Sequence, residues 1–470
     1  MQPVLTVPEM NAVDARARES TPLEVLVGRA GLAVALEALD LLGGAYGRRV
    51  VVVAGRGNNG ADGRVAARVL SARGARTAVV EAGSVESLGR CDLIIDAAYG
   101  TGFRGEYHAP GAEPGTPVLA VDIPSGVEGD TGHASGSPLA ATRTVTFVAL
   151  KPGLVQGDGA VLAGRVSVVD IGLPPGRCQV EVVDDADVDG LLRPRRGDGH
   201  KWSAPVLVVA GSPGMTGAAA LCARSAYRAG AGMVRLGVPG GALTASPATE
   251  AVSVELPAEG WAGAALEAGA RCAAVVVGPG LGRHPSTVAD VRRLVAQSPV
   301  PVVVDADGLF ALGRIATDGP PPAISPVVLT PHDGEYAGLM GTHPGPDRIG
   351  ASRRLADAAS AVALVKGPTT AVAGPDGRVL LGRSGTPALA TAGTGDVLAG
   401  VIGAFLSRGV LPREAAALAA HVHCRAGARG PGEGLVAGDL PELVALVLAE
   451  HRSAAEGPGS VGPGGVGRRG

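Results

Sequence analysis

Short apolar runs recur through the first 180 residues and alternate with helix-like segments. Strands covered on both faces of a sheet have this nearly continuous apolar character. Residues 61–73, between the first two runs, have the spacing of a helix, and another helix is expected to begin at Pro22 with Thr21 as its N-cap. We therefore predict a parallel α/β sheet with strands at residues 50–55, 77–81, 92–97, 117–126, 144–150 and 165–172.

A second series of the same kind follows a charged, turn-rich stretch at residues 184–200. The break predicts two domains, 1–190 and 198–452, each of the α/β class. Residues 453–470 are rich in Gly, Ser and Pro and are predicted to be a disordered tail. In the second domain strands are expected at 205–212, 273–282, 301–308, 326–335 and 361–370, and helices at 218–228, 286–296, 348–359, 396–407 and 413–426.

Composition narrows the classes of function. Charged residues are 18% of the 470 and the net charge is -3, so no basic field is available for nucleic acid or anionic lipid. The chain has neither a signal-peptide pattern nor a long apolar run, so we expect no membrane partner. Five scattered cysteines without a CxxC favour a cytoplasmic location over a disulfide framework or a zinc site. Lysine occurs only at Lys151, Lys201 and Lys366, where we expect arginine to be a poor substitute.

The stretch 55–60, GRGNNG, matches the GxGxxG pattern of dinucleotide-binding folds. It follows a predicted strand, opens a predicted helix and is followed by Glu81 at the end of the next strand, as in a dehydrogenase. Asp62 opposes this interpretation, because a carboxylate in the first helical turn would repel the pyrophosphate that the helix dipole attracts. The neighbouring segments must therefore decide.

Residues 55–63 (GRGNNGADG), 96–106 (DAAYGTGFRGE) and 121–126 (VDIPSG) together resemble the NAD(P)HX epimerase domain, over roughly residues 1–185. The resemblance implies a Rossmann-like three-layer fold and a K⁺ ion held by Asn59, Asp96 and Ser125. It implies substrate contacts from Asp122 and from two loops, made up of Asn58, Asn59, Gly60, Ala61, Asp62, Gly100, Thr101, Gly102, Phe103, Arg104, Gly105 and Glu106.

Asp122 is the candidate catalytic residue of this domain. In the hydrated nicotinamide, the ring nitrogen can expel the adjacent hydroxyl, which then adds to the other face, so one acid/base group near that carbon suffices. Asp122 lies at the carboxyl end of a predicted strand, where open α/β sheets bind ligands, and Lys151 is its expected electrostatic partner. Two structural alternatives stay open: Asp122 caps the PSG turn, or Asp96 caps residues 100–102.

Residues 393–396, GTGD, open a predicted helix in the second domain. Glycines let the backbone approach an anion, the helix N-terminus stabilises a transferring phosphoryl group, and Asp396 can accept a proton from an attacking hydroxyl. The alternative is a structural turn in which Asp396 only completes the helix N-terminus.

Five more motifs, GSPGMTGAA (211–219), GPGLG (278–282), DADGL (305–309), TPHDGE (330–335) and KGPTT (366–370), occur together with GTGD. The set resembles the ADP-dependent NAD(P)H-hydrate dehydratase, a ribokinase-like α/β fold, over about residues 198–450. It implies Mg²⁺ at the transferring phosphoryl group and ADP as co-substrate. It implies nucleotide contacts from Lys366, Gly367, Pro368, Thr369, Thr370 and Gly395, and hydrate contacts from Ala218 or Ala219, Gly282, His332 and Asp396. His332 could instead be a local hydrogen-bonding residue of its turn.

Together the two resemblances predict a homo-oligomeric repair enzyme acting on NADHX and NADPHX. Its first domain would interconvert the R and S epimers. Its second domain would phosphorylate the S hydrate from ADP, with Asp396 as base, and release NAD(P)H, AMP and phosphate. The alternative is a ribokinase-like vitamin or sugar kinase fused to a Rossmann-like nucleotide-binding domain, which would share GTGD but would not predict PHDGE and KGPTT beside GRGNNG.

Overall fold

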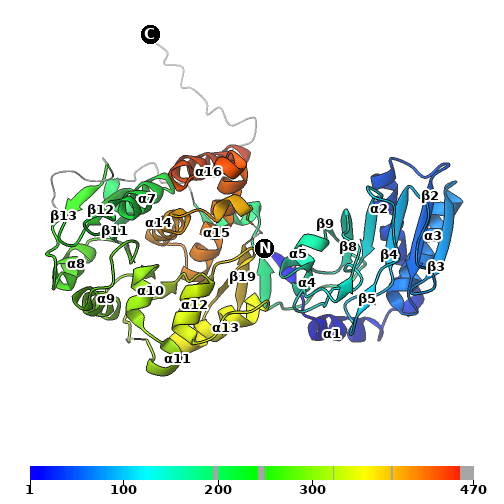
Figure 1. Cartoon of the computed structure of the whole chain (residues 1–470), viewed down its shortest axis with the longest axis horizontal. Helices are drawn as coiled ribbons and strands as arrows, with labels where there is room; N and C mark the ends of the chain where they lie inside the picture. Colours follow the sequence, from blue (N-terminus) through cyan, green and yellow to red (C-terminus); the bar gives the residue numbers. More distant parts are fainter. Residues whose placement is uncertain (194–199, 242–247, 249, 321, 383–384, 456–470) are drawn as a thin grey trace, which may run out of the picture. The chain divides into compact units, whose positions relative to one another are not determined.

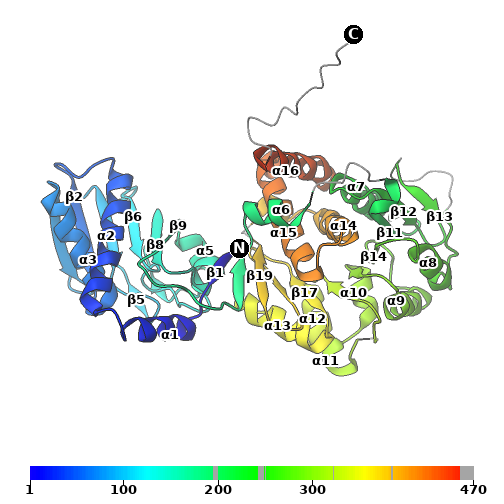
Figure 2. The same ribbon diagram turned by 180° about the vertical axis from the view of Figure 1, so that it is seen from behind.

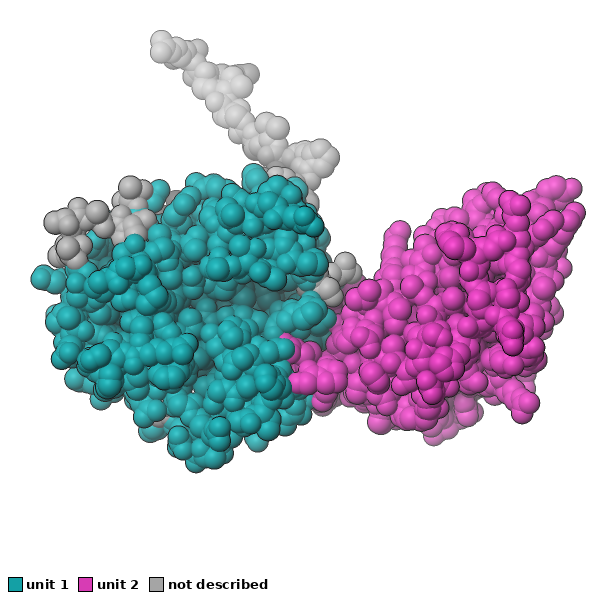
Figure 3. Space-filling model, viewed as in Figure 1, with its two compact units in different colours: residues 1, 183–344, 349–470 teal, residues 2–182, 345–348 magenta. Residues whose placement is uncertain are grey.

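The computed structural model describes residues 1–193, 200–241, 248, 250–320, 322–382 and 385–455, which form two compact units (Figure 3). Unit 2 comprises Gln2–Val182 and Gly345–Arg348. Unit 1 comprises Met1, Val183–Pro344 and Ile349–Gly470. Helix α6 (Asp185–Leu191), which the predicted 1–190 domain included, lies in unit 1 because its Val188 packs in the core of that unit.

Unit 2 contains a six-stranded, fully parallel sheet, as the apolar runs predicted (Figures 1 and 2). The helices α2 and α3 pack together over one face, where Val34, Ala38 and Leu70 meet Val52 and Ile95 of the sheet. The strand order is β3 (Arg76–Glu81), β2 (Arg49–Ala54), β4 (Leu93–Ala97), β6 (Val118–Val121), β8 (Arg143–Phe147) and β9 (Arg165–Val169).

The helices of unit 2 are α1 (Val7–Ala17), α2 (Leu23–Leu42), α3 (Asn58–Ala72), α4 (Pro152–Val155) and α5 (Gly159–Leu162). Small pairings join β1 (Gln2–Val4) to β10 (Val180–Val182) and β5 (Tyr107–His108) to β7 (Gly136–Ser137). The predicted N-cap of α2 was wrong by one residue: Pro22 has an extended backbone (ψ 142°), so it is the cap and Leu23 begins the helix.

Unit 1 is also an α/β unit, and its sheet is parallel from β11 through β17. Its strands follow the order β19 (Val379–Gly382), β18 (Thr370–Ala373), β17 (Val362–Val365), β16 (Val327–Leu329), β15 (Val302–Val304), β14 (Ala274–Val277), β11 (Pro205–Val209), β12 (Met233–Gly237) and β13 (Val252–Val254). The strand predicted at 361–370 was too long. β17 ends at Val365, a turn follows at residues 366–369, and Thr370 begins the antiparallel neighbour β18.

The core of unit 1 lies between this sheet and helices α7, α14, α15 and α16 (Figure 1). Residues 453–455 of the predicted tail continue α16, which packs on this core through Val444 and Val447, and residues 456–470 lie outside the described residues. No helix in the described ranges is both long and apolar enough to cross a membrane. The longer helices are α7 (Thr216–Arg228), α8 (Ala262–Gly269), α9 (Pro285–Gln297), α12 (Asp333–Met340), α13 (Arg348–Ala359), α14 (Thr394–Ser407), α15 (Pro412–Arg429) and α16 (Leu440–Ala455), and two short ones are α10 (Asp307–Leu312) and α11 (Ile315–Asp318).

Candidate functional sites

A cleft of about 1310 Å³ opens at the carboxyl ends of the unit 2 strands. Loops that follow β2, β4 and β6 line it, together with residues of α1 and α2. Parallel sheets place ligands at this edge, where the helix N-termini and the loops converge. Of the predicted epimerase residues, those that line the cleft are Asn58, Asn59, Asp62, Gly100, Thr101, Gly102, Phe103, Arg104, Asp122 and Lys151.

Asp122 and Lys151 form a buried ion pair in this cleft. The Lys151 ammonium, whose side chain is 1% exposed, lies 2.7 Å from Asp122 Oδ1 and also donates to Thr146 Oγ1 and to the carbonyl of Phe147. Asp122 has a positive φ of 68°, a costly backbone conformation for a non-glycine residue. Its carboxylate accepts from Lys151 and Thr146, so the alternative in which it caps the PSG turn has no support in the described contacts.

Two more carboxyl groups share the cleft. Burial raises the pKa of Asp62 to about 8, and the nearby charges of Asp122 and Asp14 add to the effect. Burial also raises the pKa of Asp14, with a contribution from Asp122. Asp62 is therefore mostly neutral at pH 7, and the sequence argument that its charge would repel a pyrophosphate was wrong, because it assumed an ionised carboxylate.

The three residues predicted to hold K⁺ are all buried. Neither amide atom of Asn59 has a hydrogen-bond partner within the described part of the chain. Asp96 accepts from the Ser125 hydroxyl at 2.6 Å, from the Ser125 backbone and from the Ala98 backbone, so it does not cap residues 100–102. Amide, carboxylate and hydroxyl oxygens are ligands that suit a hard cation, and the unpartnered Asn59 amide is consistent with such a role.

Aromatic side chains gather at the loop after β4, on one side of the cleft. The whole chain contains only four Phe, five Tyr and two Trp, yet Tyr99 packs against Phe103 and Tyr107, with ring centroids 5.3 and 5.2 Å apart. Tyr99 and Phe103 line the cleft. In this aromatic-poor chain the three rings, tilted or edge-on to one another, give this part of the cleft an apolar wall.

The glycines of the loop at residues 55–60 are required for different structural reasons. A Cβ on Gly55 would lie 1.9 Å from the carbonyl oxygen of Ala98, and one on Gly60 would lie 1.9 Å from the carbonyl oxygen of Gly55. Both positions thus exclude a side chain because of the protein's own backbone. A Cβ on Gly57 would meet nothing within 4 Å, so this glycine leaves open space at the cleft.

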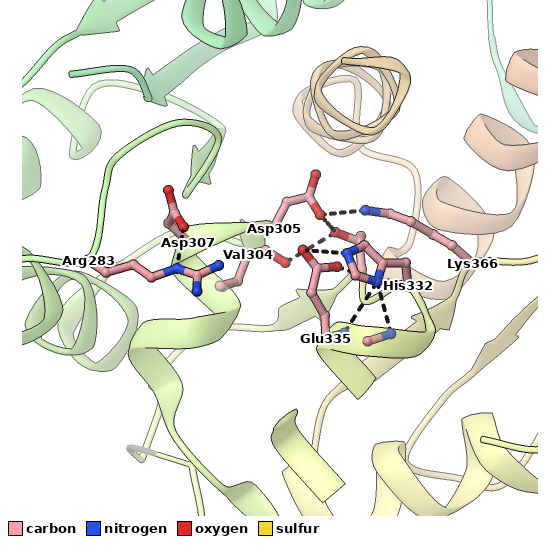
Figure 4. Close-up of polar contacts among 9 residues, drawn as sticks. Arg283, Val304, Asp305, Asp307, His332, Glu335 and Lys366 are labelled. Atoms are coloured by element: carbon pink, nitrogen blue, oxygen red, sulfur yellow. Dashed lines mark hydrogen bonds and ion pairs between the residues drawn. The ribbon is translucent and has the colours of Figure 1, made fainter. Parts of the chain in front are cut away.

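The second site lies in unit 1, where β15, β16 and β17 end (Figure 4). Asp305, directly after β15, is 1% exposed, and its Oδ1 accepts from the Lys366 ammonium at 2.6 Å and from Thr330 Oγ1 at 2.8 Å. Burial alone would lower the pKa of Lys366, but the Asp305 and Glu335 carboxylates outweigh it and raise the pKa. Lys366 therefore carries a fixed positive charge at the β17–β18 turn.

Asp396 lies in the first turn of α14, next to this charge. A Cβ on Gly395 would lie 3.3 Å from Lys366 Nζ and 3.7 Å from Asp305 Oδ2, so the GTGD turn passes directly over the ion pair. Burial raises the pKa of Asp396 to about 6, Asp305 adds to the rise, and Lys366 opposes it. A carboxylate with this pKa is ionised at neutral pH and remains a better base than an ordinary aspartate.

His332 and Glu335 begin α12 as a capping pair (Figure 4). His332 Nδ1 accepts from the backbone N–H groups of Gly334 and Glu335, and the Glu335 carboxylate accepts from the His332 backbone. The local hydrogen-bonding role that the sequence left open is therefore present. The His332 side chain is nevertheless 61% exposed, and its Nε2 lies 3.5 Å from Glu335 Oε1.

The remaining predicted contacts of unit 1 surround the same edge of the sheet. Ala218 faces the GPGLG loop, since a Cβ on Gly280 would lie 3.0 Å from its Cβ, whereas Ala219 is fully buried. The Gly282 backbone donates to Asp307 Oδ2 at 2.9 Å. Gly367, Pro368 and Thr369 lie in the β17–β18 turn, and Thr370 begins β18.

The curated relatives match nearly the whole chain. It is 37% identical to the bifunctional NAD(P)H-hydrate repair enzyme Nnr of Moorella thermoacetica, over 95% of this chain and 96% of that protein. It is also 37% identical to the protein of the same name from Mycobacterium leprae, over 97% and 99%. The chain belongs to the bifunctional NAD(P)H-hydrate repair enzyme family.

The two halves of this family are recognised separately. A family model described as NAD(P)H-hydrate dehydratase matches residues 206–447, and one described as YjeF-related protein N-terminus matches residues 23–90 and 77–153. A ribokinase-like superfamily protein from Enterococcus faecalis superposes on 58% of this chain and 96% of its own, with a TM-score of 0.51 and 18% identity. The predicted fold classes of both halves are confirmed.

The sequence did not predict three residues of these two sites: Asp14, Tyr99 and Asp305. Asp305 ends an apolar run and Tyr99 is a rare aromatic residue inside the 96–106 motif, so both had a signal. Asp14 had none, because α1 precedes the sheet and only tertiary packing brings it to the cleft. Glu335 was predicted, with His332, to lie in a strand-to-helix loop where ligand groups are common, and the structure adds that it is the reciprocal cap of His332.

Proposed function

We propose that this chain repairs hydrated NADH and NADPH. Unit 2, which corresponds to the predicted domain 1–190, interconverts the R and S epimers of NAD(P)HX. Unit 1, which corresponds to the predicted domain 198–452, dehydrates the S epimer with ADP and yields NAD(P)H, AMP and phosphate. Membership of the repair-enzyme family over 95% of the chain supports both activities. The observation that carries the second is Asp396 beside the Lys366–Asp305 pair at the glycine turn.

The chemical difficulty in unit 1 is that hydroxide is a poor leaving group. Phosphate is a good one, so phosphorylation of the ring hydroxyl removes this difficulty. We propose that Asp396 accepts the proton of the ring hydroxyl as that oxygen attacks the β-phosphoryl group of ADP. The ring nitrogen then expels phosphate, and the neighbouring carbon loses a proton to restore the nicotinamide. Lys366 and the amides of the GTGD turn stabilise the charge on the transferring group.

The proposed ligand contacts of unit 1 follow the same edge. Lys366, Gly367, Pro368, Thr369, Thr370 and Gly395 hold the nucleotide, and Ala218, Gly282, His332 and Asp396 hold the hydrate. Mg²⁺ bound with the nucleotide would neutralise phosphate charge; the Asp305 and Glu335 carboxylates suit it, since this ion usually takes one or two carboxylates together with substrate phosphates.

In unit 2 we propose that Asp122 is the base and that Lys151, 2.7 Å from its Oδ1, fixes it in place. The mostly neutral Asp62 is the proton donor in the same cleft. K⁺ held by Asn59, Asp96 and Ser125 would tie the asparagine-rich loop to the end of β4 and to the loop after β6. The contacts from residues 58–62 and 100–106 complete the substrate site.

With both activities on one chain, both epimers of the hydrate can be repaired, because unit 2 converts the R epimer, which unit 1 does not accept, into the S epimer. We further propose a cytoplasmic protein, supported by five free cysteines. We also propose a homo-oligomer, supported by Val25, Leu32 and Leu36, which lie exposed on one side of α2. Sedimentation of the purified chain tests the oligomer.

The decisive test is a coupled assay on an epimer mixture of NADHX with ADP and Mg²⁺. We expect complete recovery of the absorbance of reduced nicotinamide. No recovery would refute the proposed function. Phosphorylation of a vitamin or sugar, with no effect on NADHX, would favour the kinase alternative.

A further inference from the structure

An ion pair at one end of the unit 2 cleft has no part in the proposed chemistry. Arg64 of α3 donates through Nη1 to the carbonyl of Gly55 at 2.8 Å and through Nη2 to Oε1 of Glu81, the last residue of β3. Both side chains line the same cleft as Asp122. They are 33% and 57% exposed, so a ligand can reach them.

The strand order separates this pair from the reacting end. The sheet order includes the run β3, β2, β4, β6, in which Glu81 ends β3 and Asp122 directly follows β6. Three spacings of about 4.8 Å place the two strand ends roughly 14 Å apart along the cleft. The GRGNNG loop, after β2, lies between them. A dinucleotide with its hydrated ring at Asp122 can thus lay its pyrophosphate near this loop and its adenosine half toward β3.

We propose that Arg64 and Glu81 form the subsite for the 2′ position of the adenosine ribose and that they set the choice between NADHX and NADPHX. This inference rests on the proposed epimerase function. The Glu81 carboxylate accepts a hydrogen bond from the 2′-hydroxyl of NADHX. The Arg64 guanidinium pairs with the 2′-phosphate of NADPHX, which a planar fork binds through two parallel hydrogen bonds.

The geometry allows one site to serve both forms. Arg64 is anchored by the Gly55 carbonyl, so its guanidinium stays at the cleft when Glu81 moves. Glu81 is the more exposed partner and can turn toward solvent as a phosphate takes its place. Arg56, exposed in the neighbouring loop and also lining the cleft, adds a second positive charge for that phosphate.

The test measures epimerisation of NADHX and NADPHX in parallel by the full chain without ADP, so that unit 1 stays idle. Each run starts from one pure epimer, and chromatography follows the appearance of the other. Arg64→Gln should raise the KM for NADPHX about tenfold more than that for NADHX, the size expected for one lost charged hydrogen bond. Glu81→Gln should raise the KM for NADHX and leave that for NADPHX unchanged or lower. In both variants kcat should hold.

Asp92→Asn is the matched control. It alters the exposed Arg48–Asp92 ion pair of the same unit, away from the cleft, and should leave the ratio of the two KM values unchanged. A ratio that stays within twofold of wild type in both Arg64→Gln and Glu81→Gln would overturn the inference alone. A wild-type chain that epimerises neither hydrate would refute the proposed function, and the inference with it.

Discussion

Replacing Asp396 by asparagine should stabilise unit 1 while abolishing dehydration. Burial is the largest cause that raises the pKa of this carboxyl from 3.8 to about 6, and Lys366 only partly offsets it. At neutral pH the folded chain therefore holds a carboxylate where a neutral group would be more stable. Asparagine has nearly the same shape and cannot ionise, so it removes that penalty together with the base.

The pKa shift sets the size of the effect. A rise of about two units corresponds to about 3 kcal/mol of lost stability once the carboxyl is fully ionised in both states, at 1.36 kcal/mol per unit. Asparagine forgoes the attraction of Lys366 and needs partners for its own amide, so we expect a net gain of about 1–3 kcal/mol. For a domain of this size, that is a rise in Tm of about 3–10 °C.

The stability difference between Asp396 and asparagine depends on pH. The folded pKa lies above the unfolded one, so the penalty is full above pH 6, about half at pH 5 and absent below the unfolded value of 3.8. Calorimetry at pH 7.5 and pH 5 should follow the transition that ADP shifts, which belongs to unit 1. The advantage of Asp396→Asn should shrink at the lower pH.

A control of opposite sign is Asp376→Asn. Burial acts to raise the pKa of Asp376, but the Arg413 guanidinium at 2.7 Å outweighs it and the pKa is lowered. Removing this largely exposed charge should therefore cost a little stability at pH 7.5. An Asp396→Asn Tm at or below wild type, or an advantage equal at both pH values, would refute the reasoning.

Three further results are expected. Asp122→Asn should slow epimerisation at least about a hundredfold, the usual contribution of a general base, so absorbance recovery from mixed epimers should stop at the S fraction; fast, complete recovery would contradict this role. The epimerisation rate should fall as the pH rises through about 8, where Asp62 loses its proton. Asp62→Asn should lower the rate and abolish this alkaline fall; a fall that persists in the variant would show that another group causes it. Lys366→Arg should reduce dehydration at least about tenfold while epimerisation is unchanged, because a planar guanidinium cannot take the compact place of the ammonium beside Asp305 and Gly395; full activity would show that only the charge matters.

Periodicity predicted all six strands of the large unit 2 sheet, but in unit 1 it missed β12, β13 and β19. The apolar runs at 50–55 and 301–308 became β2 and β15, because a strand buried on both faces leaves a continuous apolar signature. The run at 361–370 was predicted as one strand, but its Lys-Gly-Pro-Thr segment forms the turn at residues 366–369, and only Thr370 belongs to the next strand, β18. Apolar runs therefore predict where strands lie more reliably than they predict the ends or the number of the strands.

Sites were harder to predict, because their members are far apart in sequence. Asp305 and Lys366 are 61 residues apart and meet only because β15, β16 and β17 lie side by side. Asp62 was visible in the sequence, but its charge state was not. The cleft that buries it and the carboxylates of Asp14 and Asp122 reverse the electrostatic argument that its position in the helix suggested.

The scarcity of lysine has a structural explanation at two of its three positions. Lys151 donates to three acceptors that converge on one point, Asp122 Oδ1, Thr146 Oγ1 and the carbonyl of Phe147, which matches the three N–H groups of an ammonium and not a planar fork. Lys366 is confined by Asp305 on one side and by the close approach of Gly395 on the other. Lys201, in contrast, is exposed. In a chain that otherwise uses arginine, a buried lysine paired with a strand-end aspartate is therefore a signal of a reactive site, and an exposed one is not.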